Sequence, residues 1–156
     1  MEIQFEKLKG NPNQFFDILP NDWKISIVPN WIFYKKTATI YVIKENNEII
    51  CGGIVFTEKL KEMTPFEISH AYLFADGFNY LGYIWVAEHK RNLQLATTWL
   101  SYLKALNPNQ KYWLTIEEEQ LNYFYKKNGF KLFSESHNDF DNTIKEWIFT
   151  YTPNIS

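Results

Sequence analysis

The sequence has few residues that could crosslink the chain or hold a metal ion. Cysteine occurs once, at Cys51, which excludes an internal disulfide framework and a cysteine-built zinc site. The three histidines, His70, His89 and His137, lie far apart, so we expect no histidine-rich metal site either. A chain of 156 residues can bury a sizeable hydrophobic core, and we expect it to fold without such crosslinks.

Long apolar runs and a basic excess are also missing. No stretch of about 18 apolar residues occurs, so the sequence predicts no transmembrane helix. Residues 1–6 lack the basic and apolar pattern of a signal peptide. The formal net charge is −2, whereas nucleic-acid-binding domains usually carry a clear basic excess. We therefore expect a cytoplasmic protein with neither a membrane nor a nucleic acid as partner.

What the sequence does contain is an alternation of strand and helix patterns. Alternating or β-branched runs predict strands at residues 2–8, 39–43, 48–56, 80–86, 111–116, 130–133 and 143–151. Helical patterns cover residues 14–19, 64–74, 92–106 and 117–128, and residues 21–36 are expected to form one or two short helical turns. This order predicts a mixed α/β fold in a single domain, residues 1–156, with both local hairpins and crossovers.

Several turns carry local signals of their own. Asn13 is placed to cap the first helix, and Thr64 with Glu67 forms the pattern of a capping box. The pair Gly52–Gly53 inside a strand indicates a bulge or the close approach of another segment. Gly129 is placed to end the last helix in a left-handed conformation.

Residues 80–106 give the clearest indication of a binding site. An apolar strand ends at Val86, a short polar loop follows, and an amphipathic helix begins near Asn92. The unpaired N–H groups at a helix N-terminus attract anions. Arg91, the single arginine among 16 basic residues, adds donors suited to phosphate. The pattern indicates a phosphate site, although an ordinary solvated loop would show the same residues.

Two motifs in series resemble the GCN5-related N-acetyltransferase (GNAT) family. The family's central motif is Val, four residues, then Arg-x-x-Gly-x-Gly/Ala, and here Val86 is followed by Arg-Asn-Leu-Gln-Leu-Ala at residues 91–96. Its next motif, Leu-Tyr-x-x-x-Gly-Phe, corresponds to Phe-Tyr-Lys-Lys-Asn-Gly-Phe at residues 124–130. The resemblance covers residues 80–134 at the level of motifs. It implies a central mixed, mostly antiparallel sheet flanked by helices, with an extra helix before the central strand.

The resemblance also implies that acetyl-CoA binds between two splayed strands, residues 80–86 and 111–116. Its pyrophosphate would lie on backbone N–H groups, its pantetheine would follow the end of the first strand, and an N–H near Val86 would polarise the acetyl carbonyl. The implied cofactor-binding residues are Trp85, Val86, Arg91, Asn92, Leu93, Gln94, Leu95, Ala96 and Thr97. Tyr125 maps to the family's proton donor for the leaving thiolate, and no metal is implied.

Some residues depart from the family pattern. Gln94 replaces the central glycine, Asn92 replaces a frequent glycine, and Glu118 replaces an asparagine. The Gln94 side chain would be tolerated if it points away from the phosphates, and would otherwise weaken or abolish CoA binding. The strand lacks the glutamate that often serves as the base, and His70 on the extra helix is the candidate in its place. The alternative for His70 is an ordinary surface histidine.

The sequence thus favours an N-acetyltransferase that transfers an acetyl group from acetyl-CoA directly to an amine of a small molecule or peptide. A non-catalytic binding or interaction module with the same fold is the alternative, motivated by Gln94 and the missing glutamate. A third hypothesis, acylation of a nucleic acid such as a charged tRNA, is disfavoured by the net charge. By analogy, the last strands could form the edge of a homodimer.

Overall fold

The computed structural model describes residues 2–137 and 144–154. Within them, seven strands form one sheet in the order β1-β2-β3-β4-β5-β7-β6. The strands are β1 (Gln4–Lys7), β2 (Ala38–Glu45), β3 (Glu48–Phe56), β4 (Phe78–Val86), β5 (Lys111–Ile116), β6 (Lys131–Glu135) and β7 (Trp147–Tyr151). Neighbouring strands are antiparallel except for β4 and β5, which run parallel.

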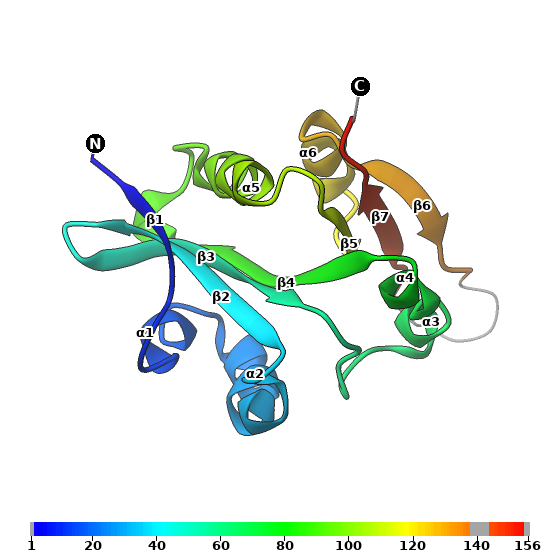
Figure 1. Cartoon of the computed structure of the whole chain (residues 1–156), viewed down its shortest axis with the longest axis horizontal. Coiled ribbons are helices and arrows are strands. Elements are labelled where there is room, and N and C mark those ends of the chain that lie inside the picture. The colour runs from blue at the N-terminus through cyan, green and yellow to red at the C-terminus, as the bar shows by residue number, and fades with distance from the viewer. Residues whose placement is uncertain (1, 138–143, 155–156) are drawn as a thin grey trace.

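Helices cover both faces of the sheet. They are α1 (Asn13–Phe16), α2 (Asn21–Tyr34), α3 (Pro65–Ile68), α4 (Tyr72–Ala75), α5 (Leu95–Leu106) and α6 (Leu121–Lys127), with a 3-10 turn η1 (Glu88–Lys90). Figure 1 shows α1 and α2 against one face, α5 and α6 against the other, and α3 and α4 near the start of β4. Among the described residues, no helix is both long and apolar enough to cross a membrane.

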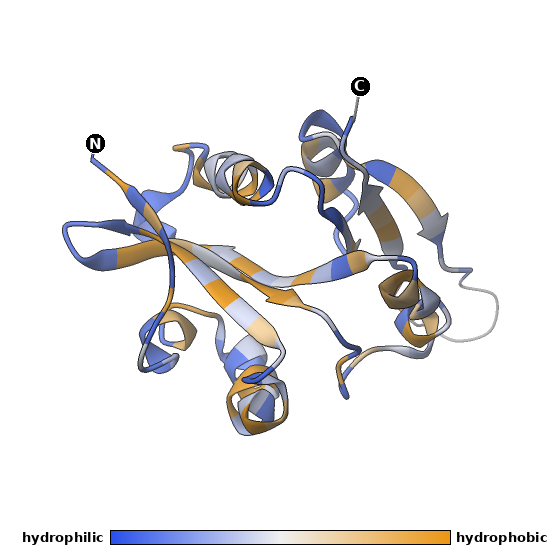
Figure 2. Cartoon of the chain, in the orientation of Figure 1, coloured by the Kyte–Doolittle hydropathy of each residue, from blue (hydrophilic) through white to orange (hydrophobic). Residues whose placement is uncertain are grey.

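Each face of the sheet carries its own hydrophobic core. Phe15, Phe56 and Trp113 belong to the core beneath α1 and α2, and Trp99 and Phe149 belong to the core beneath α5 and α6. A strand directs successive side chains to opposite faces, so the central strands contribute to both cores. Figure 2 shows the apolar residues along these strands and polar residues at the tip of the β2–β3 hairpin.

The predicted fold class is confirmed, and so are several local signals. The hairpin of β2 and β3 turns at Asn46 and Asn47, both with positive φ. Thr64 and Glu67 form the complete capping box at the start of α3. Gly129 follows α6 with φ of 90°.

The prediction for residues 21–36 was wrong, because α2 is one continuous helix with Pro29 inside it. The side-chain amide of Asn30 donates to the Ser26 carbonyl at 2.8 Å, next to the carbonyl that proline leaves without a donor. The outward face of α2 is itself apolar, with exposed residues such as Ile25 and Ile32. Apolar residues on both faces hide the helical period on which the prediction depended.

Other boundaries also differ from the prediction. Asn13 is inside α1 and caps nothing, whereas the Asn11 side chain accepts from the Asn13 N–H at 2.9 Å. The helix expected over residues 64–74 is split into α3 and α4. The acidic residues 117–119 precede α6 and are not part of it. The last strand begins at Trp147, and residues 138–143 of its predicted beginning and of the loop before it lie outside the described residues.

The glycine pair in β3 allows helices to approach the sheet from both sides. A Cβ atom on Gly52 would lie 2.5 Å from Phe15 Cε1 in α1, and one on Gly53 would lie 2.7 Å from the Trp99 ring in α5. The pairing of β3 with β4 also shifts at this point. Both readings of the sequence signal, a bulge and a close approach, therefore hold.

We expect Gly52→Ala to lower the free energy of unfolding by about 1–3 kcal/mol, because the fully buried Phe15 must move to admit the new methyl group. Equilibrium unfolding in urea measures the loss. Gly10→Asn is the control, since no heavy atom lies within 4 Å of its Cβ position and asparagine tolerates its positive φ; its effect should stay below about 1 kcal/mol. Equal losses in the two variants would contradict the packing argument.

Candidate active site

The two central parallel strands separate soon after they begin. β4 and β5 pair only at Phe78 with Lys111, Asn79 with Tyr112 and Tyr80 with Trp113. Beyond Tyr80, no strand within residues 2–137 and 144–154 pairs with the edge of β4 that faces β5. β4 also bends at Tyr83, whose φ is +57°, where its pairing with β3 shifts register.

A cavity of about 380 Å³ fills the gap between the separated strands. Residues 80–84 of β4 and 114–116 of β5 form two of its walls, and Tyr125 of α6 lines it as well. Tyr83 belongs to the core on the α2 face, whereas Tyr125 belongs to the core on the α5 face. The cavity therefore reaches both faces of the sheet, so that two reactants could meet in it from opposite sides.

Tyr125 presents a polar group to this cavity from an apolar setting. Its ring packs against Phe124, Phe130 and Phe149, and only 7% of the residue is exposed. Among the described residues none forms a hydrogen bond with its hydroxyl. Burial raises the pKa of Tyr125 well above its usual value, so the hydroxyl stays protonated at neutral pH. Tyr125 is thus available as a hydrogen-bond donor.

The loop after β4 exposes a run of backbone donors. The N–H groups of residues 92–97 make no hydrogen bond to any described residue, and no side chain caps α5. Asn92 and Gln94 have φ of 65° and 59°, the left-handed region that glycine favours. Both residues are exposed. The backbone conformation expected of a glycine-containing phosphate loop is therefore present although the glycines are not.

Arg91 is held at the entrance to this loop. Its Nε donates to the Val86 carbonyl at 2.9 Å, and its guanidinium lies 4.4 Å from the centre of the Trp85 ring. The Ala87 N–H donates to Ile50 in β3. Because successive peptide groups of a strand point to opposite sides, the Val86 N–H faces away from β3, toward the gap.

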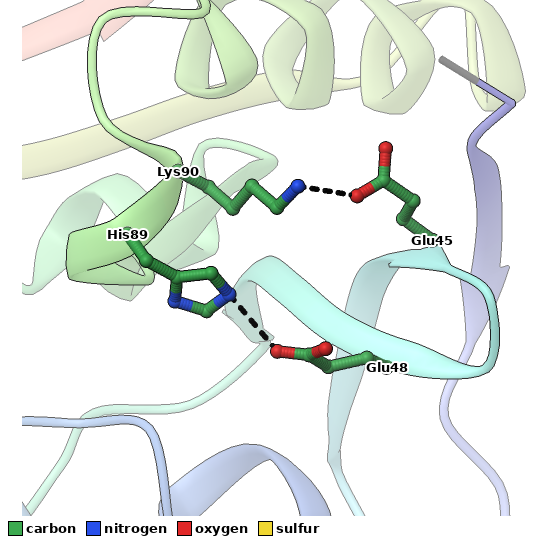
Figure 3. A network of polar contacts seen from close by, with 4 residues as sticks. All are labelled: Glu45, Glu48, His89 and Lys90. Carbon is green, nitrogen blue, oxygen red and sulfur yellow. Dashed lines mark hydrogen bonds and ion pairs between the residues drawn. The ribbon is translucent and has the colours of Figure 1, made fainter.

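Two polar contacts tie the loop to the tip of the β2–β3 hairpin (Figure 3). Lys90 Nζ lies 2.5 Å from Glu45 Oε1, and His89 Nε2 lies 3.0 Å from Glu48 Oε1. Both pairs come from the turn η1, directly before the exposed donors. The hairpin therefore helps to fix the position of the loop, a role that the sequence did not indicate for either residue.

Carboxylates from separate parts of the chain gather around the cavity. Six acidic residues line it: Asp22, Glu62, Glu67, Glu117, Glu118 and Glu146. The Tyr80 hydroxyl donates to Glu67 at 2.7 Å, and the Thr64 hydroxyl donates to Glu146 at 2.8 Å. Sequence reasoning missed this cluster, because its members are spread from α2 to β7 and no spacing links them.

The structure also places the remaining predicted residues. His70 does not line the cavity; its Nδ1 lies 2.9 Å from the Phe66 carbonyl oxygen, and its ring packs beside Phe66 and Phe133. Glu118 lines the cavity and accepts from the Gln120 amide at 3.0 Å. The proposed base and the proposed proton donor Tyr125 are therefore not brought together.

Comparison with solved structures identifies the architecture. The chain is similar to an aminoglycoside 6'-N-acetyltransferase complexed with coenzyme A, with a TM-score of 0.71 and 13% identity over 98% of this chain and 99% of that chain. The chain has the GNAT fold. It is also similar to the ribosomal-protein-S18-alanine N-acetyltransferase from Escherichia coli, with a TM-score of 0.70 and 12% identity over 99% and 96% of the two chains.

A third similar structure is a GNAT family acetyltransferase from Elizabethkingia anophelis with acetyl-CoA bound, with a TM-score of 0.62 and 17% identity over 96% of this chain and 97% of that chain. No family model matches the sequence, and no curated protein matches it. The GNAT fold is therefore recognisable from the geometry of the chain, at sequence identities of 12–17% to these structures.

We expect Gln94→Gly to raise the free energy of unfolding by about 0.5–1 kcal/mol, because it relieves a left-handed backbone that L side chains disfavour. The matched control is Thr98→Gly one turn further along, where α5 is regular and glycine should lower the free energy by about 0.5–1 kcal/mol. Urea unfolding measures both. A loss in both variants would show that Gln94 carries no conformational strain.

Proposed function

We propose that the chain is an N-acetyltransferase that transfers an acetyl group from acetyl-CoA to an amine of a small molecule or peptide. The observation that carries the proposal is the cavity between β4 and β5, with a buried tyrosine on its wall and exposed phosphate-type donors at the end of the same strand. The similar structures named above are acetyltransferases, and two of them were solved with coenzyme A or acetyl-CoA.

The residues present fit this co-substrate. The free N–H groups of residues 92–97 and the guanidinium of Arg91 would hold the pyrophosphate. The unpaired edge of β4 would hold the pantetheine, with Trp85 and Val86 at its end. Because Gln94 keeps the left-handed conformation and is exposed, its side chain leaves the backbone donors accessible.

Acetyl-CoA would supply the acyl group as a thioester, and the chain's own residues orient the reaction. An N–H of β4 near Val86 would donate to the carbonyl oxygen as negative charge develops there. The amine nitrogen forms the new C–N bond as the C–S bond breaks. Tyr125 gives its hydroxyl proton to the departing sulfur and regains a proton from solvent, while the cavity carboxylates can accept the proton that the amine loses.

A covalent route through cysteine is unsuited to this chain. Cys51 is fully buried in β3, and burial raises the pKa of its thiol to about 12. A thiol with this pKa is almost wholly protonated at neutral pH, and the thiolate is the nucleophile. Direct transfer to the amine is therefore the proposed route. His70 takes no part in it, since its imidazole does not line the cavity.

A non-catalytic module is the second candidate, favoured by the absence of the family's central glycine at Gln94. Such a module would bind CoA through the same loop and show no transfer to any amine. The protonated Tyr125 and the open cavity favour the enzyme, because a module that only binds CoA needs neither.

Tyr125→Phe is expected to lower kcat by about 10²-fold while the Kd for acetyl-CoA stays within about twofold. The reason is that the change removes only the hydroxyl and leaves no described hydrogen-bond partner unsatisfied. Release of free thiol measures turnover. Tyr123→Phe on the same helix is the control, since Tyr123 is 74% exposed and should tolerate the change. Unchanged turnover in Tyr125→Phe would remove Tyr125 from the mechanism.

Acetyl-CoA at about 100 times its Kd should stabilise the protein by about 2.7 kcal/mol. For a domain of this size the midpoint of thermal unfolding should rise by roughly 5–10 °C. Arg91→Ala should reduce the rise at the same concentration, while Lys9→Ala, an exposed change before α1, should not. No rise with the unchanged protein at millimolar acetyl-CoA would overturn the proposed co-substrate.

A further inference from the structure

All the charged residues that line the cavity are acidic. Its six acidic residues face no lysine, arginine or histidine among the residues that line it. Within residues 2–137 and 144–154, none of the six takes part in an ion pair. Charges of one sign lining a concave site focus an electrostatic field that concentrates ions of the opposite sign.

Two of the six carboxylates are buried. Glu67 and Glu146 are each 8% exposed. Both oxygens of Glu67 accept hydrogen bonds, from the Thr64 N–H and the Tyr80 hydroxyl. Glu146 accepts one, from the Thr64 hydroxyl to Oε1, and its other oxygen bonds to no described residue. This oxygen is therefore available to a ligand in the cavity, and a mostly buried carboxylate without an ion-pair partner among the described residues favours a cationic one.

The electrostatics of Glu146 agree with this geometry. Burial raises the pKa of Glu146; the hydrogen bond from Thr64 opposes the rise, and the nearby carboxylates of Glu67 and Glu117 add to it. The ionised form is therefore disfavoured while the cavity holds no cation. A bound ammonium group would offset this cost.

A separate observation shows that the cavity is built for a ligand. The Tyr125 side chain, also more than nine-tenths buried, lines it from the other face of the sheet with a hydroxyl that bonds to no described residue. The volume of about 380 Å³ suits a small molecule. The cluster of acids is thus one wall of a partly open site, and Tyr125 lies on another.

We infer that the acceptor is a small molecule with at least two ammonium groups, one that loses its proton and is acetylated, and one that stays charged among the cavity carboxylates. This inference rests on the proposed function. An amine must be neutral when it attacks, so the reacting nitrogen cannot balance the acidic wall. A second, unreacting ammonium group can do so, with Glu146 and Glu67 as its recognition residues.

Three amines of similar length test the inference: pentylamine with one positive charge, cadaverine with two, and 6-aminohexanoate with a carboxylate at the far end. We expect kcat/KM for cadaverine to exceed that for pentylamine by at least about tenfold, and 6-aminohexanoate to be the poorest. The advantage of cadaverine should shrink as added salt shortens the Debye length toward about 3 Å. Free thiol release reports on all three.

Glu146→Gln should reduce the ratio of kcat/KM for cadaverine to kcat/KM for pentylamine by about fivefold or more. The glutamine oxygen can still accept from Thr64, so the fold should be preserved. Glu2→Gln is the control, because it removes one carboxylate before β1, at the far edge of the sheet, and should leave the preference intact.

The outcomes separate this inference from the proposed function. Acetylation of pentylamine or 6-aminohexanoate as efficient as that of cadaverine would overturn the inference and leave the acetyltransferase standing. Acetylation only of a lysine-containing peptide would overturn the small-molecule part. If acetyl-CoA neither stabilises the protein nor loses its acetyl group to any amine, the proposed function fails. Binding of cadaverine, measured by calorimetry on the CoA-saturated protein, tests the second ammonium site without turnover; no binding would overturn it.

Discussion

The early end of the pairing between β4 and β5 is the constraint on which the site depends. The two parallel strands pair at only three positions, the last of them Tyr80 with Trp113, whose rings pack edge to face. Beyond this pair the facing backbone groups of β4 and β5 no longer hydrogen-bond to each other. The result is a cavity through the sheet and a free strand edge, and both follow from one interrupted ladder. A sheet that continued to pair would place ordinary side-chain packing where the reaction is proposed to occur.

The two faces of the sheet contribute different chemical groups to the site. On the α5 side, uncharged backbone donors and Tyr125 surround the place proposed for the thioester. On the α2 side and around the ends of β5 and β7, carboxylates dominate. Because the donor loop follows the end of β4 while the acids line the cavity, the proposed anionic co-substrate and cationic acceptor would each be met by groups of complementary charge. The contact between Lys90 of η1 and Glu45 of the hairpin helps to hold the donor loop, residues 92–97, against the sheet.

The sequence allowed most of the fold to be predicted, and the donor loop with it. Strong local signals carried these predictions, including the hairpin asparagines, the capping box at Thr64 and the stretch from Val86 to Tyr125. The continuous helix α2 was missed because apolar residues lie on both its faces. The acidic wall was missed because only the fold brings Asp22 and Glu146 together. His70 was chosen from its place in the sequence before the central strand, which does not determine where its imidazole points once the helix is split into α3 and α4.

The left-handed residues before α5 have a consequence beyond this chain. A backbone shape can outlast the residues that encode it, since Asn92 and Gln94 hold φ angles that a consensus would assign to glycine. The strain of each left-handed residue is local and small compared with the packing of a whole helix. The glycines can therefore be replaced while the backbone N–H donors keep their positions. Distant relatives of such loops are therefore better sought by their dihedral angles than by their glycines.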